Sequence, residues 1–163
     1  MPEASANDPS AGQRPRPLPS VSVVVPTYRE AGNLPELMRR LEQVRAASLP
    51  ALELVIVDDD SADGTERIVA EADHPWVRLI VRKGVRGLSS AVLEGLRQCC
   101  NEVAVVMDAD LSHPPEKIPE LVRAIAAGAD FAIGSRYVAG GSTAAAWGVF
   151  RWLNSKVATW LAW

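Results

Sequence analysis

Residues 52–60 read LELVIVDDD, an apolar run that ends in three consecutive aspartates. The run is nearly continuous rather than alternating, which is typical of a strand buried on both faces of a parallel sheet. Similar short runs occur at residues 21–25, 77–81, 103–107 and 131–133. Segments with helical spacing lie between them, and this order predicts an α/β fold with a mostly parallel sheet and helices on both faces.

The segment after the first run has the signals of an amphipathic helix. Asn33 stands in the N-cap position, and Glu36 follows three residues later in the capping-box position. The apolar face expected to pack on the sheet consists of Leu34, Leu37, Met38, Leu41 and Val44. Helical spacing recurs after Gly64, over residues 88–96 and over residues 118–125.

The length, the net charge and the positions of the cysteines restrict the possible functions of the chain. With 163 residues and a mass of 17.5 kDa, the chain has the size of one domain. A net charge of -3 and a pI near 5.4 argue against a nucleic-acid-binding protein, so the expected partners are small molecules or a surface. Cys99 and Cys100 are adjacent, which suits neither a disulfide across the domain nor a zinc site and indicates a reducing compartment.

The two ends of the chain differ in composition from its middle. The first twenty residues contain five of the twelve prolines, so residues 1–20 are expected to form a disordered tail. Residues 147–163 contain four of the five tryptophans and an apolar face at helical spacing. This composition suits an amphipathic helix at a membrane interface, with packing on the domain itself as the alternative. No uninterrupted apolar run in the chain is long enough to cross a bilayer.

Two of the expected strands run directly into acidic residues. The run quoted above ends in Asp58, Asp59 and Asp60, and a later run is followed by Asp108 and Asp110. In open α/β sheets, ligands bind beyond the carboxyl ends of the strands. Because adjacent carboxylates repel one another in a low-dielectric crevice, a cation, hydrogen-bond donors or solvent should compensate them there.

The spacing of Asp108 and Asp110 suggests a metal site. One residue separates them at the end of a strand, so both can reach one hard cation. Oxygen ligands of this kind suit Mg2+ or Mn2+, which take further ligands from water and from substrate phosphates. A helix N-cap within a solvated turn is the other interpretation of an isolated Asp-x-Asp.

Four blocks of sequence extend this pattern: VPTYRE at residues 25–30, VDDDSADGT at 57–65, MDADLSHPP at 107–115 and GSRY at 134–137. In this order they resemble the family-2 glycosyltransferases, and within that family the dolichol-phosphate mannose synthase group. The resemblance covers residues 21–155. It implies a GT-A fold, with a Rossmann-like sheet, in which residues 21–146 form the catalytic domain that binds a nucleotide-sugar.

The resemblance also implies which residues hold the nucleotide. Base and ribose would be bound by Pro26, Tyr28, Glu30, Val57 and Asp59. The chemistry agrees, because a tyrosine ring offers a stacking face for a base and carboxylates accept hydrogen bonds from a base or ribose. Asp60 stands where the family more often has Asn or Gly, so no role is carried onto it.

Asp108 and Asp110 match the family's metal-binding pair, and the backbone of Ala109 would line the same nucleotide site. Relatives often have Gln or Ser in the place of Ser112, whose short side chain would reach the metal through a water. Arg136 matches the family's phosphate-handling arginine, and its planar guanidinium suits phosphate oxygens. The residues expected to carry catalysis are therefore Asp108, Asp110 and Arg136.

Residues 82–90, RKGVRGLSS, place basic residues and glycines ahead of an expected helix N-terminus, where backbone donors favour anions. They resemble a loop of the same family. A phosphate-binding role and a simple turn between strand and helix both stay open. His113, in the loop after Asp110, is interpreted as a structural hydrogen-bonder rather than a base.

Arg151 and Ser155 are four residues apart, hence neighbours on the expected C-terminal helix, and they match the family's pair for the acceptor phosphate. No glycine or proline stop follows Trp163, so this helix is interpreted as truncated. Relatives carry further acceptor residues, and in some cases transmembrane helices, downstream. The expected location is the cytoplasmic face of a membrane, either peripheral or anchored by segments outside this chain.

The activity that the resemblance implies is inverting transfer of mannose from GDP-mannose to a polyprenyl phosphate. A phosphate acceptor is anionic at neutral pH, so no side chain has to act as a base. Two alternatives stay open: transfer of glucose from UDP-glucose to the same acceptor, and a receiver-like module that binds magnesium without catalysis. A receiver would have its acidic pair after the first strand, where this chain has Pro26, Thr27 and Tyr28.

Overall fold

The computed structural model describes residues 17–135 of the chain. Strands and helices alternate along these residues as predicted, and a short 3-10 helix, η1, precedes the last α-helix. The elements are β1 Val21–Thr27, α1 Leu34–Ala47, β2 Leu52–Asp58, α2 Thr65–Ala72, β3 Val77–Val81, α3 Leu88–Arg97, β4 Val103–Val106, η1 Pro115–Lys117 and α4 Ile118–Ala126. Most of the expected N-terminal tail and all of the expected acceptor helix lie outside the described residues.

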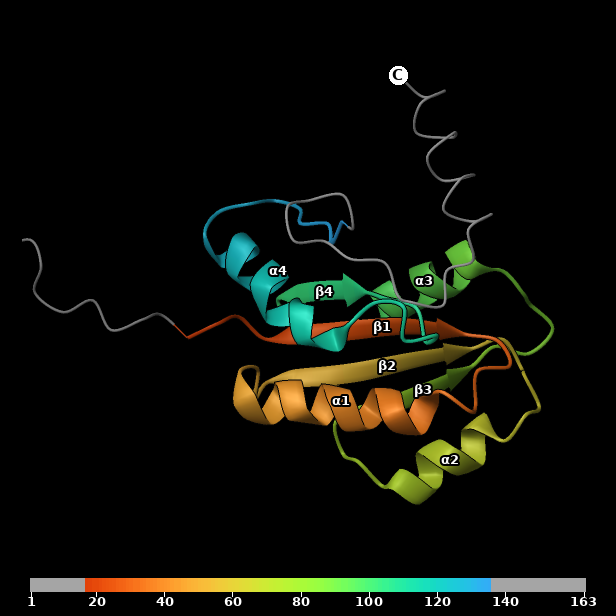
Figure 1. The fold of residues 1–163 in the computed structure, drawn as a ribbon. Helices are drawn as coiled ribbons and strands as arrows, with labels where there is room; N and C mark the ends of the chain where they lie inside the picture. The colour runs from red at the N-terminus through yellow and green to blue at the C-terminus, as the bar shows by residue number, and fades with distance from the viewer. Residues whose placement is uncertain (1–16, 136–163) are drawn as a thin grey trace, which may run out of the picture.

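All the described strands form one parallel sheet in the order β3-β2-β1-β4. β1 and β2 make the longest pairing, from Val21 opposite Leu52 to Thr27 opposite Asp58. Because the strands share one direction, their carboxyl ends meet at one edge of the sheet, where the arrowheads in Figure 1 point. The predicted parallel α/β architecture is confirmed.

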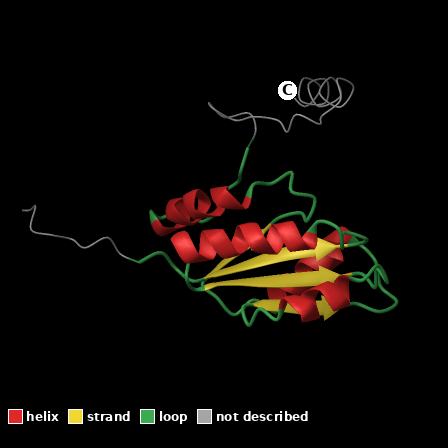
Figure 2. Cartoon of the chain, turned by 60° about the horizontal axis from the view of Figure 1, so that its bottom comes forward, coloured by secondary structure: helices red, strands yellow, loops and turns green. Residues whose placement is uncertain are grey.

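Helices cover both faces of the sheet, as the continuous apolar strands predict (Figure 2). On one face, the side chains of Val23 and Val25 pack in a core that includes α1 and reaches α2 and α4. On the other face, Val24 and Val57 pack with Ala91 of α3. The five apolar residues predicted for the inner face of α1 are all buried.

α3 lies close to the sheet because it carries a glycine at the contact. A Cβ on Gly95 would overlap the Val24 side chain and lie 3.0 Å from Cγ2 of Val57. The remaining apolar surface of α3 is open, since Leu88 is 65% exposed and Leu93 is 52% exposed. Within residues 17–135, no helix combines the length and the apolar character needed to cross a bilayer.

The prediction of a fifth strand at residues 131–133 is wrong. Residues 131–133 form no strand, and the side chains of Phe131 and Ile133 are 78% and 73% exposed. A segment of this length offers few ladder hydrogen bonds, and only packing of its side chains would hold it on the sheet. No such packing occurs among the described residues, so the apolar pattern alone does not produce a strand.

The start of α1 also differs in detail from the expectation. Asn33 is the N-cap residue, as predicted, but its side chain makes no capping hydrogen bond. Its amide instead donates to the Glu30 carboxylate over 2.6 Å. Glu36 forms an ion pair with Arg39, so the predicted capping box is not formed. The α1 N-terminus is defined by Pro35 and by the preceding loop rather than by a side-chain cap.

Candidate active site

The loops after β1, β2 and β4 are neighbours at the carboxyl edge of the sheet (Figure 1). Backbone hydrogen bonds connect them to adjacent strands: Asp59 N–H donates to Thr27 O over 3.1 Å, and Met107 N–H donates to Val24 O over 3.1 Å. The aspartates singled out in the sequence therefore lie at the edge where α/β folds bind ligands.

Asp58, the last residue of β2, fixes the turn that follows the strand. Its Oδ1 accepts hydrogen bonds from the hydroxyls of Thr27 (3.0 Å) and Ser61, and its Oδ2 accepts one from the Ser61 backbone N–H (2.8 Å). The same turn contains two non-glycine residues in the left-handed region, Asp60 (φ 53°) and Ala62 (φ 51°). Because Asp58 is only 2% exposed, its carboxylate is committed to building this turn.

Asp63 connects the loop after β1 to the start of α2. Its Oδ2 accepts a hydrogen bond from Ala31 N–H over 3.0 Å, and its Oδ1 accepts from the N–H and the hydroxyl of Thr65. Partial burial raises the pKa of the Asp63 carboxyl, but these hydrogen bonds outweigh that effect and hold its pKa below the ordinary value. Asp63 therefore also has a structural role.

Asp59 follows Asp58 in the chain and forms an ion pair with Arg82. Its Oδ1 accepts hydrogen bonds from Nε (2.7 Å) and Nη2 of Arg82, and its Oδ2 accepts from Gly87 N–H over 2.8 Å. The two charged side chains are largely buried, at 10% exposure for Arg82 and 7% for Asp59. The aspartates after β2 are thus compensated by hydrogen-bond donors, one of the possibilities expected from the sequence.

The aspartates after β4 have a different environment. Asp108, Asp110 and His113 are all exposed, and one ligand atom from each lies within 4.8 Å of the others. His113 Nδ1 accepts a hydrogen bond from Asp108 N–H over 3.4 Å and lies 3.6 Å from Asp108 Oδ2. Two carboxylate groups and an imidazole at this spacing fit a divalent cation.

The loop geometry orients the second carboxylate of this group. Ser112 N–H donates to Asp110 Oδ1 over 2.9 Å, and Leu111 between them has a left-handed backbone (φ 61°). Partial burial raises the pKa of Asp110, but the hydrogen bonds from Ser112 and the nearby His113 outweigh it and set the pKa below the ordinary value. Asp110 therefore carries a carboxylate at neutral pH. Ala109, between the two aspartates, is buried.

The other residues that the resemblance assigns to the nucleotide lie around the end of β1. Pro26 and Val57 are buried in paired strands, opposite each other in the β1–β2 register. Tyr28 is 38% exposed just after β1, with the guanidinium of Arg86 4.5 Å from its ring centroid. Glu30 accepts the hydrogen bond from Asn33 described above. The structure thus groups these residues at one end of β1 and β2.

Comparison with known sequences identifies the family. The sequence profile described as glycosyl transferase family 2 matches residues 22–160. The chain belongs to glycosyl transferase family 2. The predicted GT-A type of α/β fold and the assignment to the dolichol-phosphate mannose synthase group are both supported by the relatives described next.

Several curated relatives of this family-2 chain carry the same name. It is 48% identical over 139 residues to a dolichol-phosphate mannosyltransferase of Pyrococcus furiosus, which covers 83% of the chain and 38% of the relative. It is 40% identical over 159 residues to the dolichol-phosphate mannosyltransferase of Mycosarcoma maydis, covering 94% of the chain and 54% of the relative. The chain therefore spans about half, or less, of the length of these relatives.

Solved glycosyltransferase structures agree with the fold. A mannosyltransferase from Pyrobaculum calidifontis, solved in complex with GDP-Man and Mn2+, has a TM-score of 0.56 and 32% identity, over 66% of this chain and 31% of that chain. Glucosyl-3-phosphoglycerate synthase from Mycobacterium tuberculosis, at 20% identity and a TM-score of 0.54, covers 66% of this chain and 39% of its own and supports the fold alone. The match to glycosyl transferase family 2 over residues 22–160 contradicts the receiver-like alternative.

Some predicted site residues of the family-2 chain cannot be placed. Arg136, Arg151 and Ser155 lie outside the described residues. Conversely, the sequence did not single out Arg82 as the partner of Asp59. The contact joins residues 23 positions apart, so no local spacing indicates it. The one available signal is that Arg82 directly follows a strand that lies next to a strand with an acidic end.

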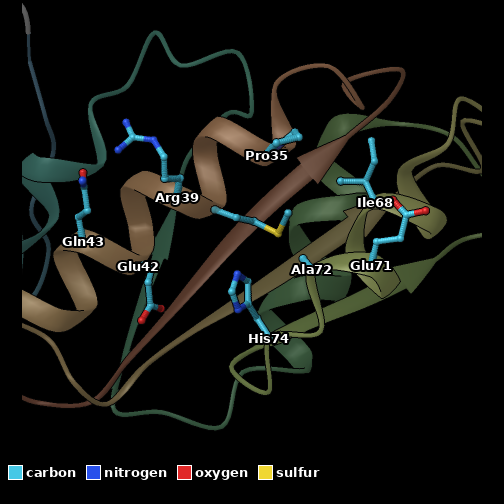
Figure 3. A pocket seen from close by; sticks show the side chains of 9 residues that line it. Pro35, Arg39, Glu42, Gln43, Ile68, Glu71, Ala72 and His74 are labelled. Atoms are coloured by element: carbon cyan, nitrogen blue, oxygen red, sulfur yellow. The ribbon is translucent and has the colours of Figure 1, made fainter.

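A groove of about 580 Å³ lies between α1 and α2 (Figure 3). Met38 and Ile68 contribute apolar side chains to its lining, and Arg39, Glu42 and Glu71 contribute charged ones. None of the predicted site residues lines it. The groove of this family-2 chain therefore does not contain the residues predicted to bind the metal or the nucleotide.

Proposed function

We propose that this chain carries the catalytic domain of an inverting enzyme that transfers mannose from GDP-mannose to a polyprenyl phosphate, giving polyprenyl-phosphate β-mannose. The observation that carries the proposal is the open group of Asp108, Asp110 and His113 at the carboxyl edge of a family-2 sheet. The names of the relatives support the sugar and the lipid acceptor. The GDP-Man in the Pyrobaculum calidifontis structure supports the nucleotide.

The cofactor of the proposed reaction is Mg2+ or Mn2+, held by Asp108 and Asp110. Their exposed carboxylates have the donor chemistry and the spacing for a hard divalent ion. When bound, such an ion supplies Lewis-acid stabilisation of the charge that develops on a leaving diphosphate. Ser112 orients Asp110 through its backbone N–H, and its hydroxyl is proposed to reach the metal through a water.

The nucleotide is proposed to lie along the ends of β1 and β2. Tyr28 offers an exposed ring for stacking on a base, and Glu30 and Asp59 offer carboxylate oxygens for base or ribose donors. Pro26 and Val57 form the buried strand ends beneath them. The backbone of Ala109 connects this region to the metal pair, and Arg136 is proposed to bind phosphate oxygens.

The protein's main catalytic contribution is then positioning. The acceptor phosphate is already anionic, so attack on the anomeric carbon requires no base, and in-line attack inverts that carbon. Arg151 and Ser155 are proposed to hold the acceptor phosphate. Membrane-surface binding at the cytoplasmic face, through residues 147–163, completes the proposal.

A second donor has specific support. The chain is 41% identical over 113 residues to an undecaprenyl-phosphate 4-deoxy-4-formamido-L-arabinose transferase of Pseudomonas fluorescens, covering 67% of the chain and 33% of the relative. That name keeps the polyprenyl phosphate acceptor but changes the sugar. A different sugar on the same acceptor, such as glucose from UDP-glucose, is therefore the second candidate.

A radiolabel transfer assay tests the proposal with the full-length protein and a short polyprenyl phosphate. Labelled GDP-mannose and labelled UDP-glucose are supplied in parallel, each with Mn2+, Mg2+ or a chelator. The expected result is metal-dependent transfer of mannose to the lipid. Transfer of glucose alone would establish the second candidate, and absence of lipid-linked label from both donors would contradict the polyprenyl phosphate acceptor.

A further inference from the structure

Arg82 follows β3 directly, and its side chain reaches across the carboxyl edge of the sheet to Asp59 at the end of β2. The contact between Arg82 Nε and Asp59 Oδ1 is 2.7 Å long, and both side chains are at least nine-tenths buried. An ion pair removed from water in this way needs its remaining polar atoms satisfied. The arrangement of those atoms determines what Asp59 can still bind.

The acceptor capacity of Asp59 is divided unequally between its two oxygens. Oδ1 receives two N–H groups of Arg82, from Nε and Nη2, and Oδ2 receives only the Gly87 N–H at 2.8 Å. A carboxylate has about four lone-pair positions, two on each oxygen. Oδ1 is therefore filled, and one acceptor position remains, on Oδ2.

Two of the three other N–H groups of Arg82 are used at the start of α3. Its Nη1 donates to the Ser90 hydroxyl over 3.0 Å, and its Nη2 also donates to Gly87 O over 3.1 Å. This set of contacts requires several N–H groups in one plane, which a guanidinium provides and an ammonium does not. Of the two roles open for residues 82–90, phosphate binding by Arg82 is thus disfavoured, because its guanidinium is engaged by protein groups.

The same loop also contacts the exposed ring at the end of β1. The guanidinium of Arg86 lies 4.5 Å from the Tyr28 ring centroid. The loop between β3 and α3 therefore contacts two of the residues assigned to the nucleotide, Tyr28 and Asp59, which come from different strands. Its geometry is coupled to the geometry of that region.

We infer that Arg82 is a positioning residue for the nucleotide, and this inference rests on the proposed function. Arg82 fixes the plane of the Asp59 carboxylate so that Oδ2 accepts a single N–H or O–H from the base or ribose. Arg82 acts on the nucleotide through Asp59. Its second contact, to the Ser90 hydroxyl, connects the Asp59 carboxylate to the first turn of α3.

A double-mutant cycle on nucleotide binding tests the inference. Binding of GDP and of UDP in Mn2+ is measured by tryptophan fluorescence and calorimetry for the complete chain and its variants Arg82→Gln, Asp59→Asn and the double variant. Arg82→Gln is expected to weaken binding of the preferred nucleotide about tenfold in the original background and less than about twofold in the Asp59→Asn background. Arg82→Lys, which keeps the charge with fewer donors, is expected to lose about threefold.

Arg67→Gln is the matched control, because it removes the same group from an exposed ion pair with Glu71 on α2. It should leave nucleotide binding unchanged. Circular dichroism reports whether each variant is folded; if Arg82→Gln does not fold, the same comparison is made with Arg82→Lys in both backgrounds.

The outcomes separate the inference from the function on which it rests. No metal-dependent binding of GDP or UDP by the original chain would overturn both. Normal binding by the original chain with equal losses on Arg82 substitution in both backgrounds would overturn the inference alone, because Arg82 would then act without Asp59. Loss of thermal stability without any change in affinity would also overturn it, since it would leave Arg82 only a structural role.

Discussion

At the end of β2, the carboxylates of Asp58, Asp59 and Asp63 are occupied by protein donors, whereas at the end of β4 the carboxylates of Asp108 and Asp110 face solvent. The first group accepts hydrogen bonds from hydroxyls, backbone N–H groups and one guanidinium. In the second group, Ser112 donates hydrogen bonds to Asp110, and His113 Nδ1 lies 3.6 Å from Asp108 Oδ2. Both groups follow parallel strands at the same edge of one sheet.

The difference shows that residue type alone does not identify a metal site. A buried carboxylate is stable only when donors satisfy it, and those donors then occupy the oxygens that a cation would need. An exposed pair keeps its oxygens available at the cost of mutual repulsion, which a divalent cation relieves. The two acidic ends should therefore respond in opposite ways to the same substitution.

The largest expected effect is the loss of metal binding in Asp110→Asn. Removing one of two carboxylates should weaken Mn2+ binding in the presence of GDP by about 100-fold or more, because the charge and an oxygen ligand are lost together. Lipid transfer by the full-length protein should fall accordingly. The free energy of unfolding should change by less than about 0.5 kcal/mol, since the side chain is exposed. Calorimetry and urea denaturation measure the two effects, and unchanged Mn2+ affinity would contradict the assignment.

The opposite response is expected for Asp58→Asn. The amide nitrogen cannot accept the Ser61 N–H that Oδ2 now accepts, so the free energy of unfolding should fall by about 2 kcal/mol. Mn2+ affinity should change less than about threefold, because the residue lies outside the metal group. Asp60→Asn is the matched control: it is exposed and has a left-handed backbone that Asn tolerates. Equal stability of the two variants would contradict the structural role of the Asp58 carboxylate.

A smaller effect, seen in the pH dependence of stability, is expected at Asp63. Its pKa is lowered in the folded chain, so its contribution to stability is fully present above the ordinary aspartate pKa and is lost as the pH falls through the lowered value. Asp63→Asn should lower the free energy of unfolding near neutral pH and make the acid branch of the stability curve shallower. Urea denaturation at a series of pH values measures this, and an unchanged acid slope would remove the structural role of the charge.

The smallest expected effect is that of Ser112→Ala. The backbone N–H of residue 112 still donates to Asp110 Oδ1, and only the contribution of the hydroxyl to the lowered pKa of Asp110 is lost. Mn2+ affinity should therefore change by no more than about threefold. A loss as large as that of Asp110→Asn would make Ser112 a direct ligand and would extend the metal group beyond the two aspartates.

The sequence predicts those parts of the molecule that depend on local pattern. The parallel strands through β4, the helices between them and the buried face of α1 follow from apolar spacing, which acts over a few residues. Residues 131–133 have the same pattern but form no strand, because a strand also needs a partner that the pattern does not specify.

The residues of the candidate site also differ in whether local sequence pattern could predict them. The metal pair lies on one short loop, so Asp108 and Asp110 could be grouped from spacing alone. The partners of Asp58 and Asp59 come from other strands and loops, such as Thr27 and Arg82, and no local pattern connects them. The sequence could therefore indicate that the carboxylates after β2 need compensation, but not that the protein itself supplies it.

The location of Mn2+ in crystals grown with GDP tests the metal site most directly. One anomalous peak is expected between the carboxylates of Asp108 and Asp110, within bonding distance of the diphosphate, and none near Asp58 or Asp63. A diphosphate and manganese peak located elsewhere, for instance in the groove between α1 and α2, would contradict it.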